Sequence, residues 1–146
     1  MVNVDLVGRQ FAAQSFEVSA AKIREFARAT RVTHPAHFDA EAARALGASD
    51  LVAPLTFVIT PAQDAERLYM SDPESGIVFE RVVHGGQEFH YHRPAVAGDV
   101  LSATYTVESI APKPTMTIIV GRIAIVDAAG EPVAEAISTI IERAEA

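Results

Sequence analysis

Cysteine and tryptophan are both absent from this chain of 146 residues. Without cysteine there are no disulfides, no zinc–thiolate sites and no thiol nucleophiles, a composition that fits a reducing compartment. No apolar run reaches the roughly 20 residues that a bilayer-spanning helix needs. The N-terminal stretch MVNVDLVGRQ has no charged segment followed by an apolar one, so we expect no signal peptide and a cytoplasmic location.

Positive charge is also scarce, because 12 Lys and Arg residues face 19 Asp and Glu residues and the formal charge is -7. An acidic surface repels the phosphates of nucleic acids and anionic lipid headgroups, so we expect neither nucleic acid nor membrane as a partner. Apolar residues make up 49% of the sequence, which is enough for a sizeable core. The length suits one domain, residues 1–146.

Helix signals are concentrated in the first half. A short strand or extended lead over Phe11–Val18 precedes Ser19, whose hydroxyl can cap a helix from Ala20 to near Thr30. Asp39 can cap a second, shorter helix over Ala40–Leu46.

The stretch Leu51–Leu68 allows two interpretations. Pro54 suits the first turn of a helix, whereas Pro61 would break or kink a helix that continued through it. The segment is therefore either one helix in two pieces, or a strand-like run over Leu55–Ile59 followed by a helix from Thr60.

The second half has the alternation and the β-branched residues of strands. Turns are expected at Ala97–Asp99, Ala111–Pro114 and Asp127–Gly130. Helices first and a long antiparallel meander afterwards predict the α+β class. The expected strands are Ile77–Val83, Gln87–His92, Val100–Ile110, Thr115–Val126 and Pro132–Ile141.

Three segments, in this order, carry a family resemblance: RVTHPAHFDAEAARALG, LVAPLTF and HGGQEFHYHRPAVAGD. Together they resemble the MaoC-like hot-dog dehydratases, and most closely the N-terminal, FAS1-like dehydratase half. That half also exists as separate small subunits of mycobacterial (3R)-hydroxyacyl-ACP dehydratases. The resemblance implies a hot-dog fold, in which an antiparallel sheet wraps around a central helix and pairs with a second such sheet. The segment from Pro54 would supply that helix.

Catalytic members of the family carry a motif similar to Gly-Asp-x-Asn-Pro-x-His. The resemblance implies that its His takes the proton next to the carbonyl of a 3-hydroxyacyl thioester, while its Asp helps the hydroxyl leave as water. Aligned through Pro35, the motif His falls on His37, the Asn position holds His34 and the Asp position holds Val32. Valine cannot exchange protons, so His37 is either a base without its acid or a structural turn residue.

The family fold suggests where a substrate would bind. An acyl chain would lie along Leu55, Phe57 and Ile59 beside the central helix, although such residues are more often core. Arg93 either meets the phosphates of a carrier's prosthetic group at the pocket mouth or is simply solvated. We expect no cofactor.

For His84, and for the pair His90 and His92, the favoured interpretation is a structural role. His84 precedes Gly85 and Gly86, which favours a β-bulge with a structural histidine over a close approach to a ligand or a neighbouring chain. His90 and His92 share a strand face with a glutamate, but no third ligand converges on them, so we expect no metal.

The sequence thus predicts a subunit of an (R)-3-hydroxyacyl-thioester dehydratase of fatty-acid metabolism, acting on an ACP or CoA thioester. It would shape the acyl tunnel, and whether it has activity alone stays open. One alternative is a stand-alone homodimeric dehydratase, hydratase or thioesterase using His37; another is an acyl-thioester binding protein without chemistry. Because Thr115–Val126 is apolar on both faces and a lone sheet leaves an open edge, we expect a homodimer alone, or a heterodimer with a catalytic hot-dog chain.

Overall fold

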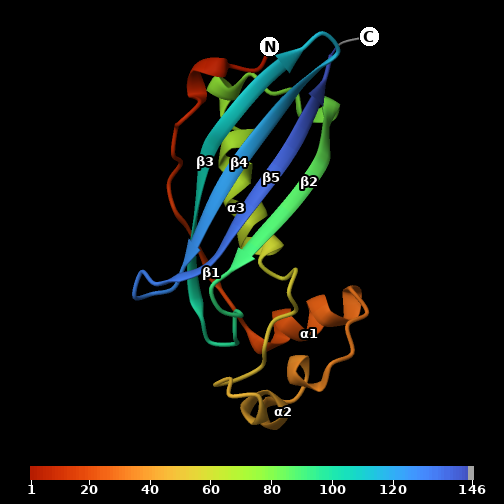
Figure 1. The fold of residues 1–146 in the computed structure, drawn as a ribbon, viewed down its shortest axis with the longest axis vertical. Helices are drawn as coiled ribbons and strands as arrows, with labels where there is room; N and C mark the ends of the chain where they lie inside the picture. The colour runs from red at the N-terminus through yellow and green to blue at the C-terminus, as the bar shows by residue number, and fades with distance from the viewer. Residues whose placement is uncertain (145–146) are drawn as a thin grey trace.

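A five-stranded antiparallel sheet wraps along one helix in the computed structural model, which describes residues 1–144 (Figure 1). The strand order is β1-β3-β4-β5-β2. This arrangement confirms the α+β, hot-dog prediction. The helices are α1 (Ala20–Ala29), α2 (Ala40–Ala45) and α3 (Ile59–Met70), and the strands are β1 (Gln14–Glu17), β2 (Val82–Tyr91), β3 (Val100–Lys113), β4 (Met116–Val126) and β5 (Pro132–Arg143).

Side-chain caps fix the starts of the first two helices, as predicted. The Ser19 side chain accepts a hydrogen bond from the backbone N–H of Lys22 at 3.1 Å. Asp39 accepts one from the N–H of Glu41 at 2.9 Å. Each cap satisfies a backbone donor that has no partner within its helix.

The central helix is α3, and it begins at Ile59 rather than at Pro54. The strand-like interpretation of Leu55–Ile59 is wrong, because Leu55, Thr56, Phe57 and Val58 form turns, in which the N–H of Phe57 donates to the carbonyl of Pro54 at 2.9 Å, and Ile59 begins α3. Pro61 falls in the first turn of α3, where a missing N–H leaves no helical hydrogen bond unmade. The proline that was expected to interrupt the helix is therefore compatible with its start.

Two strand boundaries also differ from the prediction. The predicted strands Ile77–Val83 and Gln87–His92 are one strand, β2, which begins at Val82 and continues through a bulge between His84 and Gly86; a 3-10 helix, Phe79–Arg81, precedes it. β3 runs through the expected Pro-rich turn to Lys113. Pro112 is tolerated there because β1 pairs only with the start of β3, so β4 is the only strand neighbour of Pro112.

The core lies between α3 and the inner face of the sheet. Tyr69 of α3 stacks on Tyr105 of β3, with ring centroids 5.4 Å apart. Gly121 of β4 makes room for this pair, because a Cβ at that position would overlap the ring of Tyr105. Both phenol hydroxyls are buried, and neither has a hydrogen-bond partner among residues 1–144.

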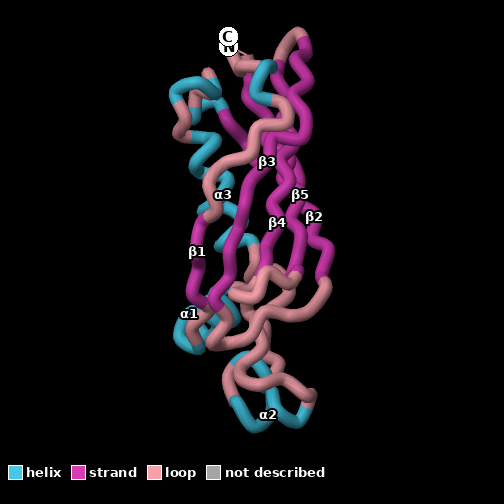
Figure 2. Tube along the Cα trace, turned by 90° about the vertical axis from the view of Figure 1, so that its left-hand side faces the viewer, coloured by secondary structure: helices cyan, strands magenta, loops and turns pink. Residues whose placement is uncertain are grey.

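The segment that holds α1 and α2 forms a lobe beyond one end of the sheet, as both views show (Figures 1 and 2). Two leucines of this segment are highly exposed, Leu46 at 65% and Leu55 at 72%. No helix in the described part of the chain is long and apolar enough to cross a membrane. The lobe therefore exposes apolar side chains near the N-terminus of α3.

Candidate functional site

His37 ends a short 3-10 helix, Pro35–His37, in the lobe. Its Nδ1 lies 2.7 Å from the carbonyl oxygen of Val52. A carbonyl only accepts hydrogen bonds, so Nδ1 carries the proton and the neutral ring keeps its lone pair on Nε2. A general base acting through Nε2 requires this tautomer.

No carboxylate partners this imidazole in the described part of the chain. Val32, at the motif's Asp position, is half-buried and apolar. Asp39, two residues after His37, uses its side chain to cap α2. His37 is thus held in the tautomer that a base acting through Nε2 would need, and no carboxylate of the described residues accompanies it.

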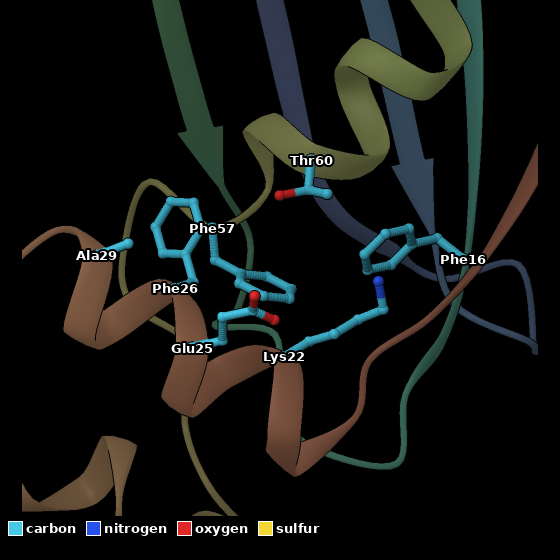
Figure 3. Close-up of a pocket in the computed structure, with 7 residues that line it drawn as sticks. All are labelled: Phe16, Lys22, Glu25, Phe26, Ala29, Phe57 and Thr60. Carbon is cyan, nitrogen blue, oxygen red and sulfur yellow. The ribbon is translucent and has the colours of Figure 1, made fainter.

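An aromatic pocket of about 250 Å³ lies beside the start of α3 (Figure 3). Phe57, 1% exposed, forms its floor and packs edge-on against Phe26 and Phe16, with ring centroids 5.5 and 6.0 Å away. Lys22 and Glu25 reach towards it from α1, and the Lys22 amine lies 5.1 Å from the centroid of the Phe16 ring. The pocket therefore has an apolar floor and a charged rim.

Of the three residues predicted to line an acyl tunnel, only Phe57 lines this pocket. Ile59 is half-buried in the first turn of α3. Leu55 points its side chain mainly to solvent and is 72% exposed. A tunnel role for Leu55 therefore requires a surface from outside this chain.

The fourth predicted binding residue, Arg93, forms ion pairs within the chain. Its guanidinium donates to both carboxylate oxygens of Asp99, at 2.8 and 3.1 Å, and to Asp127 at 3.2 Å. The hydrogen bond with Asp99 is the main reason that the pKa of Arg93 is raised. Two carboxylates around one cation leave the cluster negatively charged, which favours a structural tie between two loops over phosphate binding.

One buried polar residue was not singled out from the sequence. Glu66 of α3 is 8% exposed and accepts a hydrogen bond from the Ser138 hydroxyl of β5. Burial raises the pKa of its carboxyl. Its position four residues after Ala62 and three before Tyr69, both buried, gave a helical-spacing signal that could have placed it on the inner face.

Comparisons with known sequences identify the family of this chain. The model of the FAS1-like dehydratase domain region matches residues 5–136. A UPF0336 protein of Clavibacter michiganensis subsp. michiganensis is 46% identical over 146 residues, which cover 99% of this chain and 97% of that protein. A second UPF0336 protein, from Leifsonia xyli subsp. xyli, is 46% identical over 145 residues, with the same two shares.

Solved structures give the same result. One chain of the C-terminally truncated HadBC (3R-hydroxyacyl-ACP dehydratase) complex from Mycobacterium tuberculosis is 36% identical, with a TM-score of 0.86 over 94% of this chain and 97% of that chain. A MaoC-like dehydratase is 34% identical with a TM-score of 0.85, and the match covers 94% of this chain but only 42% of that longer one. Because the family model and these relatives cover nearly the whole sequence, the chain belongs to the FAS1-like dehydratase family of hot-dog proteins.

Proposed function

We propose that this chain is the acyl-holding subunit of an (R)-3-hydroxyacyl-thioester dehydratase of fatty-acid biosynthesis, and that a second hot-dog chain supplies the catalytic Asp and His. The observation that carries the proposal is the combination at the motif: His37 is oriented as a base, while Val32 replaces the carboxylate. The similarity to a chain of a dehydratase complex supports it.

The reaction needs one group that accepts a proton and another that donates one. Dehydration moves the C2 proton to a base, breaks the C3–O bond and requires a proton on the departing hydroxyl, giving water and a 2-enoyl thioester. An imidazole such as His37 can accept the first proton, but valine cannot supply the second. The partner's Asp and His would therefore carry out both transfers, while this chain binds the substrate.

The exposed edge of the sheet is suited to pairing with that partner. Within residues 1–144, β2 has a strand neighbour on one side only, β5. Its other edge presents backbone N–H and C=O groups that a second strand can satisfy. Val83 and Tyr91 of β2 are 42% and 36% exposed and add apolar area beside that edge.

The pocket around Phe57 would receive the acyl chain. Three phenylalanine rings form its apolar walls, and binding there gains about 25 cal/mol for each Å² removed from water. Leu55, exposed in this chain, would complete the tunnel wall once the partner covers it. Affinity should then rise with chain length until the tunnel is full.

The test compares the purified chain, alone and mixed with a hot-dog chain that has an intact Asp and His motif. The readout is the hydration of a trans-2-enoyl thioester, measured as loss of the enoyl absorbance. Hydration should be nearly absent for the chain alone and present in the mixture. His37→Ala should leave the rate of the mixture within about twofold. Robust turnover by the chain alone, abolished by His37→Ala, would instead establish a stand-alone enzyme.

A further inference from the structure

A β-bulge in β2 turns His84 towards the helix. Gly85 is an extra residue between two registers, in which His84 lies opposite Ile140 and Gly86 lies opposite Thr139. Residues directly opposite in an antiparallel pair share a face, so His84 shares the inner face with the buried Ile140. A Cβ at Gly85 would come within 2.9 Å of the Ile141 side chain, which explains the glycine.

His84 thereby reaches a second pocket, of about 350 Å³, between α3 and β2. The buried Glu66 of α3 and the exposed His84 of β2 both line it. Its walls come from Met70, Phe79, Val82 and Ile140, and Gln63 and Arg67 complete its lining.

The Glu66 carboxyl is the buried hydrogen-bonding group of this pocket. Ser138 donates to Oε1 of Glu66, which leaves Oε2 without a hydrogen-bond partner among the described residues. Burial raises the pKa of Glu66 and favours the neutral carboxyl, which can donate as well as accept. Arg67, the nearby cation, is 67% exposed and forms an ion pair with Asp64.

We propose that this pocket binds an apolar chain that bears an uncharged hydroxyl, with the hydroxyl held between Glu66 and His84. A hydroxyl both donates and accepts, so it matches a carboxyl and an imidazole together. A carboxylate ligand would be repelled whenever Glu66 ionises, and an ammonium ligand would require that ionisation in a buried position. The hydroxyl has two possible sources, a free fatty alcohol or a hydroxylated acyl chain on a thioester.

Isothermal titration calorimetry of the full chain with three eight-carbon probes tests the chemistry: octan-1-ol, octanoate and octylammonium. Octan-1-ol should bind most tightly. Loss of one neutral hydrogen bond lowers affinity by about threefold to tenfold, so Glu66→Leu and His84→Ala should each weaken octan-1-ol binding by that factor. Glu66→Gln keeps the side-chain volume and some hydrogen bonding, and should fall between them and the wild type.

Glu41→Gln is the matched control, because Glu41 lies on the exposed side of α2 and should leave binding unchanged. Thermal unfolding verifies that each variant folds. Comparing octan-1-ol with 8-hydroxyoctanoyl-CoA identifies the source of the hydroxyl, and binding of either one that depends on Glu66 supports the site. Equal affinity of the wild type and a folded Glu66→Leu or His84→Ala variant, or tighter binding of octanoate, overturns it. That result would leave turnover with the catalytic partner, and thus the proposed function, unaffected.

Discussion

The two histidine sites beside α3 differ in what accompanies the imidazole. At the lobe, a backbone carbonyl orients His37 and no carboxylate of residues 1–144 bonds to it; between α3 and β2, His84 and the buried carboxyl of Glu66 line one pocket. The first site has the orientation of a base without its acid. The second has both groups, but in an apolar pocket that favours the neutral acid. The oriented imidazole at the first site thus lacks a carboxylate, whereas the second site combines an imidazole and a carboxyl in one pocket.

The largest expected effect comes from disturbing the packing behind the second site. Gly121→Ala should lower the free energy of unfolding by about 3 kcal/mol, because the new methyl group would overlap the ring of Tyr105. Urea unfolding measures it. Gly86→Ala is the matched control, since a Cβ there meets nothing closer than 3.8 Å and the loss should be small. Similar losses for both variants would show that steric overlap is not the cause.

The next variant places a carboxylate at the first site, which lacks one. Val32→Asp should raise the hydratase rate of the isolated chain by about tenfold or more, because acid–base assistance contributes about a hundredfold or more when correctly placed. Val32→Asn should give no gain, and adding His37→Ala should remove the gain. If a folded Val32→Asp variant stays inactive, the half-buried position of residue 32 does not direct a carboxylate at the substrate.

The Arg93 cluster differs from both histidine sites, because the charge of Arg93 is paired within the chain. Arg93→Gln should destabilise the protein by about 1 kcal/mol, a modest value because the arginine side chain is 34% exposed. Chemical denaturation checks this value, and the loss should shrink in high salt. Unchanged stability combined with weaker binding of a CoA thioester would favour the phosphate-binding role instead.

The smallest expected effect is a pH dependence that belongs to the second site. Burial raises the folded-state pKa of Glu66, so folding favours its protonated form. The stabilising contribution is complete below the unfolded pKa and is lost as pH rises through the folded pKa. Glu66→Gln should therefore flatten the decline of stability above about pH 4, measured by urea unfolding between pH 4 and 8. An identical pH profile in wild type and variant contradicts this assignment.

The sequence predicted the overall fold well because local signals and the family motifs agreed. Ser19 and Asp39 cap the helices they were expected to cap. The Leu55–Ile59 run was ambiguous because short apolar runs suit a turn, a strand or a helix equally, and tertiary contacts decide among them.

The sites were harder to predict than the fold. His37 and Val32 were identified from the motif, but the carbonyl that fixes the tautomer comes from Val52, 15 residues away. The Glu66 and His84 pair depends on a bulge, and the face that His84 occupies changes with one inserted residue. No local pattern reports which residue of a neighbouring helix then lies opposite.

The position of β2 at the sheet edge also has a consequence for synthesis on the ribosome. Its only strand neighbour, β5, begins at Pro132, about 40 residues after β2 ends. At about 5–20 residues per second, β2 waits for several seconds with both edges unpaired. During that interval the nascent chain can pair with a strand of another molecule. Correct assembly therefore depends on when a partner or a chaperone reaches β2, and not only on how tightly it binds.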